Sequence, residues 1–165
     1  MRTYDESVTL QTYWVGPGRK GRRILLVALG LPLPFSVYIS YMAQTSHLVL
    51  CVDDEQVGLY VRKILLERAG YRVLTAQDGP SGLELFAQEP VDAVVLDYSM
   101  PGMHGGEVAI KMRATKPEVP ILLLSAYVGL PLEVTALVNL YMTKGEGAPV
   151  LLEKLECLLQ KVSVP

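Results

Sequence analysis

The chain has 165 residues, of which 50% are hydrophobic and 19% are charged. This length is enough for one globular domain with a sizeable core plus an extension. The formal net charge of −2 excludes the strongly basic surface that nucleic acids or anionic membranes require, so we expect neither partner. The two cysteines, Cys51 and Cys157, match no disulfide framework or zinc spacing. We expect both thiols to be buried, and a reducing, cytoplasmic location.

Residues 1–41 differ in character from the rest of the chain and predict an N-terminal extension. A basic cluster at residues 19–23 (RKGRR) precedes residues 24–42, which carry no charge and are mostly apolar. This order is typical of a membrane span or a signal sequence, although two prolines would interrupt a helix there. Three interpretations stay open: translation that truly starts at Met42, a membrane-associated extension through residues 24–42, or a cleaved signal.

From residue 47 onward, short apolar runs alternate with helical patterns. The apolar runs cover residues 47–52, 72–76, 93–96, 121–124 and 140–143. Between and after them, apolar residues recur at helical spacing: Val57, Val61 and Leu65; Leu83 and Phe86; Val108 and Met112; a weak pattern over 132–138; and Leu151, Leu155 and Leu158. Five strands that each precede a helix predict an α/β fold, namely a (βα)5 doubly wound five-stranded parallel sheet with helices on both faces.

Four of the apolar runs end in polar residues. Asp53 and Asp54 follow the first run, Asp97 the third, Ser125 the fourth and Lys144 the last. Because the carboxyl ends of parallel strands lie along one edge of a sheet, we expect these side chains to share one shallow cleft. Three crowded carboxylates repel one another unless a cation sits among them, and hard oxygen ligands select Mg²⁺. A lysine and a hydroxyl beside such a metal site suit a phosphoryl group.

The motifs around these residues resemble those of a known family. They are VDDE at 52–55, LDYSMPGMHG at 96–105, LSAY at 124–127 and YMTKG at 141–145. In this order and at these spacings they are similar to the receiver (CheY-like) domains of two-component response regulators, over residues 46–162. The resemblance implies a CheY-like, flavodoxin-like fold. It also implies a single-domain response regulator, since few residues follow the last predicted helix.

The resemblance assigns phosphoryl chemistry to five positions. Asp97 would accept a phosphoryl group from a phosphohistidine of a sensor histidine kinase or a phosphotransfer protein. Lys144 and the Ser125 hydroxyl would bind the phosphoryl oxygens, together with the backbone of Ala126 and Ser99. The protein would therefore be a phosphoacceptor and not an enzyme, apart from self-dephosphorylation.

The resemblance also implies a cofactor and an output. Asp54 and Asp97 would bind Mg²⁺ directly, Asp53 chiefly through water, and Ser99 through its backbone carbonyl. After phosphorylation, Ser125 and an aromatic switch residue, Tyr141, would move. The face made by helix 4, strand 5 and helix 5 would then change shape and be read by a downstream protein that the sequence does not identify.

The chain departs from the family pattern in two places. Gly145 follows Lys144 where the family usually has a proline, so a cis peptide bond is not expected there. The segment between Ser125 and Lys144 is short, which predicts a short or distorted fourth helix and an atypical output face. Two alternatives stay open. One is a phosphorylation-independent binding module on this fold. The other is a Mg²⁺-dependent aspartyl-phosphate phosphotransferase, against which Ser99 argues because such enzymes need a second carboxylate there.

Overall fold

The structure is a computed structural model that describes residues 9–15, 22–28 and 47–162. The chain divides into two units, residues 1–45 and residues 46–165. In the first unit, β1 (Thr9–Val15) pairs antiparallel with β2 (Arg22–Ala28). The start of the predicted membrane-like segment, residues 24–28, is therefore a strand and not part of a helix, while residues 29–42 lie outside the described residues. No helix among the described residues has the length and apolar character that crossing a membrane requires.

The second unit is built on a five-stranded parallel sheet with the strand order β4-β3-β5-β6-β7. Its strands are β3 (Leu48–Val52), β4 (Arg72–Ala76), β5 (Ala93–Asp97), β6 (Ile121–Ser125) and β7 (Leu140–Thr143). All residues of β3, β5 and β6 are buried, as expected for central strands that are covered by helices on both faces. The order and direction confirm the predicted (βα)5 fold.

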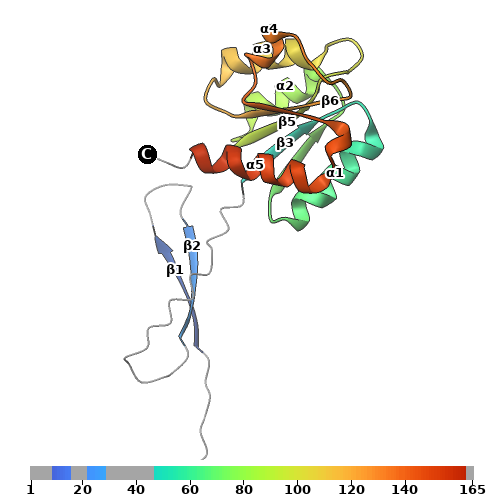
Figure 1. Cartoon of the computed structure of the whole chain (residues 1–165). Helices are drawn as coiled ribbons and strands as arrows, with labels where there is room; N and C mark the ends of the chain where they lie inside the picture. The colour runs from blue at the N-terminus through green and yellow to red at the C-terminus, as the bar shows by residue number, and fades with distance from the viewer. Residues whose placement is uncertain (1–8, 16–21, 29–46, 163–165) are drawn as a thin grey trace, which may run out of the picture. The chain divides into compact units, whose positions relative to one another are not determined.

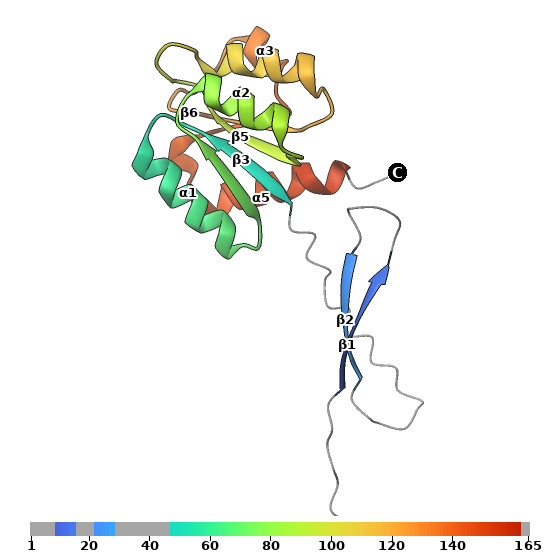
Figure 2. The ribbon, with the colours of Figure 1, turned by 180° about the vertical axis from the view of Figure 1, so that it is seen from behind.

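Helices cover both faces of this sheet (Figures 1 and 2). They are α1 (Gln56–Arg68), α2 (Gly79–Gln88), α3 (Gly105–Thr115), α4 (Leu132–Thr135) and α5 (Ala148–Val162). Helices α1 and α5 lie on one face, and α2 and α3 lie on the other. Alternate strand residues divide accordingly: Leu50 and Leu96 join the core under α2 and α3, whereas Val49 and Val95 join the core under α1 and α5.

One sequence prediction about burial is wrong, and one helix presents an unexpected face. In α1, Val57 and Val61 of the predicted helix face are 70% and 58% exposed, while Leu65 is half-buried. The helix buries Leu59 and Leu66 instead, a pair seven residues apart that also shares a helix face. Cys157 was expected to be buried and is exposed on α5, while Cys51 is buried in β3.

The fourth helix is short, as predicted. It spans Leu132–Thr135 rather than the whole 132–138 stretch. Arg113 of α3 holds the segment that follows: its Nε donates a hydrogen bond to the carbonyl of Leu137 at 2.8 Å, and its guanidinium also donates to the side chain of Asn139. No cis peptide bond occurs among the described residues, so the bond between Lys144 and Gly145 is trans.

Candidate functional site

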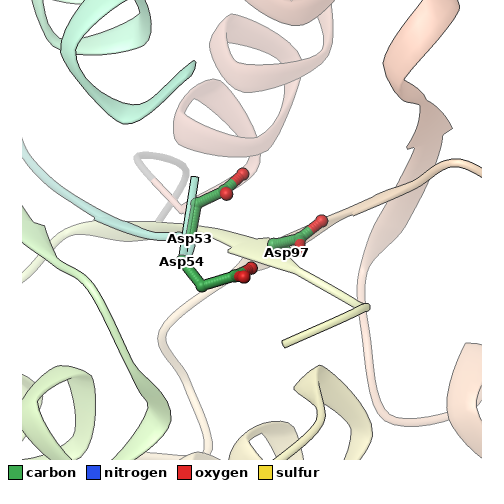
Figure 3. Close-up of side chains that lie close together, drawn as sticks. All are labelled: Asp53, Asp54 and Asp97. Atoms are coloured by element: carbon green, nitrogen blue, oxygen red, sulfur yellow. The ribbon is translucent and has the colours of Figure 1, made fainter. Parts of the chain in front are cut away.

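The ends of two neighbouring strands bring three carboxylates together. Asp97 is the last residue of β5, and Asp53 and Asp54 directly follow β3, its partner in the sheet. Oxygen atoms of the three side chains lie within 4.8 Å of one another. Figure 3 shows them projecting toward the same side of the strand ends. Asp53 and Asp97 are 1% exposed, whereas Asp54 is exposed to solvent.

Asp97 is the least satisfied of the three. Both of its carboxylate oxygens are buried, and neither receives a hydrogen bond of ordinary geometry from the described residues. Its partner is an ion pair, in which the ammonium of Lys144 lies 2.8 Å from Oδ1. Burial raises the pKa of Asp97, and the charges of Asp53 and Asp54 raise it further, although Lys144 opposes them. An ionised Asp97 therefore needs further positive charge.

Lys144 reaches into this cluster from the first residue after β7. Its Nζ also lies 3.3 Å from Oδ2 of Asp53, and its side chain is 31% exposed. Burial alone would lower the pKa of Lys144, but the carboxylates of Asp97 and Asp53 outweigh burial and raise it. The raised pKa favours the charged ammonium.

The turn that carries Lys144 is fixed without the proline usual in the family. Residues Lys144–Glu146 form one 3₁₀ turn, and Thr143 and Glu146 close a capping box around it. The Thr143 amide donates to Oε1 of Glu146 at 2.7 Å, and this bond lowers the pKa of Glu146. Gly145 meets no other atom within 4 Å of the position of a Cβ, so the turn gains its order from the capping box.

Ser125 ends β6, beside the strand of Asp97. It is fully buried, and its Oγ accepts a hydrogen bond from the Tyr127 amide at 2.9 Å. That bond orders the turn after β6 and does not use the hydroxyl proton. Ala126 lies exposed in the same turn. The phosphoryl-binding roles of Ser125 and Ala126 stay predictions.

Two further predicted residues lie near the site without a contact that assigns their roles. Ser99 is exposed, two residues after Asp97, in the loop that leads to α3. Tyr141 is in β7 and is 45% exposed. It lines a cavity of about 500 Å³ together with residues of α4, α5 and the intervening segments. The space beside Tyr141 is compatible with a side chain that changes position.

The sequence analysis missed Arg62. This residue of α1 donates a hydrogen bond from its guanidinium to Oδ2 of Asp53, the same oxygen that Lys144 approaches. Oδ1 of Asp53 accepts from the Glu55 amide at 2.8 Å. The sequence feature that could have indicated this contact is a basic residue, Arg62, with a glycine, Gly58, one helical turn before it.

Two more residues position the loop after Asp97, and the sequence did not identify them as part of the site. A Cβ added to Gly105 would lie 2.3 Å from the carbonyl oxygen of Asp97, so only glycine fits the start of α3 against β5. His104 lies on the surface and caps α3. Its Nδ1 accepts hydrogen bonds from the amides of Gly106 and Glu107.

The donor set fits a divalent cation. Carboxylates are the hard oxygen ligands of Mg²⁺, and this cation is commonly held by one or two of them. Asp97 offers two buried oxygens without hydrogen bonds, and Asp54 offers a carboxylate that faces solvent. Asp53 differs, because both of its oxygens already have partners in the chain.

Comparisons with known proteins agree with this geometry. A family model described as the response regulator receiver domain matches residues 49–156. The transcriptional regulatory protein YkoG of Bacillus subtilis is 34% identical over 116 residues, which are 68% of this chain and 51% of that protein. The response regulator MprA of a Mycobacterium species is 36% identical over 118 residues, which are 70% of this chain and 51% of that protein. The chain spans about half the length of the curated relatives it matches.

Solved structures show the same fold. The Thermotoga maritima response regulator TrrA, crystallised with Mg²⁺ and BeF, is 35% identical with a TM-score of 0.65, over 68% of this chain and 99% of that one. TrrA in complex with the histidine kinase ThkA is 34% identical with a TM-score of 0.64. The match covers 68% of this chain and 98% of that one. The Vibrio cholerae chemotaxis protein CheY4 is 29% identical with a TM-score of 0.65. The match covers 68% of this chain and 98% of that one.

Proposed function

This chain belongs to the response regulator receiver domain family, and on that premise we propose that Asp97 accepts a phosphoryl group from a histidine kinase. The observation that carries the proposal is the environment of Asp97. Its buried carboxylate pairs with Lys144, lies among two other carboxylates and receives no ordinary hydrogen bond from the described part of the chain. Apart from the Lys144 ammonium, no donor of those residues competes for its oxygens, which supports a role as nucleophile.

The transfer is written with Asp97 as the nucleophile. A carboxylate oxygen attacks phosphorus, the P–N bond of the phosphohistidine breaks, and its electron pair returns to the imidazole nitrogen. The product is an acyl phosphate on Asp97. Lys144, now 2.8 Å from Oδ1, would pair with a phosphoryl oxygen as a charge-assisted donor. The Ser125 hydroxyl and the amide of Ala126 would bind the other side of the group.

We propose Mg²⁺ as the cofactor of this site. Asp54 and Asp97 would hold it directly, with the carbonyl of Ser99, and Asp53 would act through water. When bound, Mg²⁺ neutralises charge that develops on the transferring phosphoryl group. The presence of Mg²⁺ and BeF in the TrrA structure supports this assignment.

The proposed output is a change of the face formed by α4, β7 and α5. Ser125 would move toward the phosphoryl group, and Tyr141 would turn into the space this leaves. A local electrostatic event would thus bias a two-state surface that a downstream protein reads. The short α4 supports an output surface of unusual shape. The kinase is the proposed upstream partner, as in the ThkA–TrrA complex.

We further propose that the protein is a phosphoacceptor and not an enzyme acting on a separate substrate. An aspartyl-phosphate phosphotransferase would need an acid–base carboxylate two residues after the nucleophile. That position is Ser99, whose hydroxyl cannot take this role at neutral pH.

The test is phosphorylation by phosphoramidate, whose P–N bond matches that of phosphohistidine, with acetyl phosphate as a second donor. Intact-protein mass would be measured for the wild type with and without Mg²⁺, and for D97N. D78N is the matched control, since Asp78 caps α2 and asparagine caps equally well. We expect one phosphoryl group on the wild type and on D78N, only with Mg²⁺, and none on D97N. An adduct on D97N, or none on the wild type, would contradict the proposal.

A further inference from the structure

Arg62 places a permanent positive charge on the acidic cluster. We propose that this residue holds Asp53 in an ion pair and thereby lowers the affinity of the cluster for Mg²⁺. Arg62 would then act as a positioning residue that tunes the metal site from α1. The inference rests on the proposed function, because it takes Mg²⁺ to be the cation of this site.

The contacts show that Asp53 is already engaged. Arg62 is 14% exposed and donates to Oδ2 of Asp53, whose side chain is 1% exposed. Lys144 lies 3.3 Å from the same oxygen, and the Glu55 amide donates to the other one. A cation that sought Asp53 would have to compete with Arg62, whereas Asp97 offers two oxygens without hydrogen bonds.

A glycine in the first turn of α1 leaves room for this contact. Gly58 lies one turn before Arg62, and a Cβ added there would lie 3.4 Å from both terminal nitrogens of the guanidinium. A methyl group would touch the guanidinium and would lie still closer, at 3.1 Å, to Oε2 of Glu55, and a larger side chain would displace the guanidinium. Glycine inside a helix is destabilising by about 1 kcal/mol relative to alanine. The combination of Gly58 and Arg62 therefore favours an arginine that crosses the helix surface to reach the acidic cluster.

The charges give the direction of the effect. Ionised Asp53, Asp54 and Asp97 carry three negative charges, and Lys144 and Arg62 return two positive ones. A guanidinium stays protonated in proteins, so its charge is constant across the accessible pH range. Removing it leaves a more negative cluster, which attracts a divalent cation more strongly. A purely structural ion pair would instead alter stability without this change in affinity.

The experiment is calorimetric titration of Mg²⁺ into the wild type, R62M and R62K. Methionine keeps the length and apolar stem of the side chain and removes its charge, whereas lysine keeps the charge. K63M is the matched control, because Lys63 is the next residue of α1 and pairs only loosely with Glu67, at 3.9 Å. We expect R62M to bind Mg²⁺ about tenfold more tightly than the wild type. R62K and K63M should stay near the wild-type affinity.

The outcomes separate this inference from the proposed function. Equal Mg²⁺ affinity of the wild type and R62M, or weaker binding by R62M, overturns the inference while the metal site stands. Absence of Mg²⁺ binding in both proteins overturns the inference and the metal part of the proposed function together. If R62M does not fold, G58L provides the same test, since leucine displaces the guanidinium and favours the helix. G58L should then bind Mg²⁺ more tightly than the wild type, and unchanged affinity overturns the inference.

Discussion

The ammonium of Lys144 lies 2.8 Å from Oδ1 of Asp97, although β6 separates their strands in the sheet. The lysine side chain therefore spans the end of a whole strand to reach the acceptor. Its charge opposes the burial that raises the pKa of Asp97. The pair links the end of β7, where the proposed switch residue Tyr141 lies, to the proposed site of phosphorylation.

Replacing Lys144 by methionine is expected to slow phosphorylation of Asp97. The transition state loses a charge-assisted donor, and the buried carboxylate loses its counterion. We expect the initial rate with phosphoramidate to fall by about tenfold or more, since one such donor contributes at least 1.4 kcal/mol. The rate is measured by intact-protein mass over time. K111M, which removes an exposed lysine of α3, should leave the rate unchanged, and an unchanged rate in K144M would remove Lys144 from the mechanism.

The raised pKa of Asp97 predicts that D97N stabilises the metal-free protein at neutral pH. A carboxyl whose pKa is higher in the folded chain binds its proton more tightly there. Its contribution to stability is complete below the pKa of the unfolded chain and is lost as the pH rises through the folded-state value. Asparagine cannot ionise, so D97N does not lose this stability at neutral pH. The midpoint of thermal unfolding in EDTA at pH 7 should therefore rise by a few degrees.

The same measurement at lower pH provides the control for this prediction. As the pH falls, Asp97 takes up its proton in the folded protein before it does so in the unfolded chain, and the difference between D97N and the wild type should shrink. D78N is expected to show no comparable gain at neutral pH, because hydrogen bonds from Ser81 lower the pKa of Asp78. A D97N protein that unfolds at a lower temperature than the wild type at pH 7 would disprove the argument.

Gly105 is expected to tolerate no side chain. A Cβ there would lie 2.3 Å from the carbonyl oxygen of Asp97 and 2.9 Å from the Cα of Tyr98. G105A must push α3 away from the acceptor strand, and we expect the free energy of unfolding to fall by about 1–3 kcal/mol. G145A is the matched control, since nothing lies within 4 Å of its added Cβ. Urea denaturation measures the stability of both variants. Equal unfolding midpoints for G105A and G145A would show that α3 shifts without loss of stability.

The two cysteines should differ sharply in reactivity. Burial raises the pKa of the Cys51 thiol to about 12, so it carries almost no thiolate at neutral pH, whereas Cys157 is exposed. In the native protein, Ellman's reagent should modify one thiol, and it should modify both after denaturation. C157S should abolish the native reaction. Rapid modification of native C157S would mean that β3 opens to solvent.

The sequence by itself determined the sheet and the residues at its edge. Buried strands are continuous apolar runs, and the polar residue that ends each run marks the carboxyl end of the strand. This reasoning placed Asp53, Asp97 and Ser125 correctly at the strand ends, because the parallel direction of the strands follows from their alternation with helices. The short α4 followed from the segment between Ser125 and Lys144, which is shorter than is usual in the family.

Only the tertiary structure decided which helix face is buried and which side chains meet across elements. The stripe of Val57 and Val61 and the pair of Leu59 and Leu66 both have helical spacing, and the packing of α1 on the sheet selects the second. The contact of Arg62 with Asp53 depends equally on the position of that helix. Periodicity fixes which residues share a face, but the direction of that face is set by contacts between segments distant in sequence.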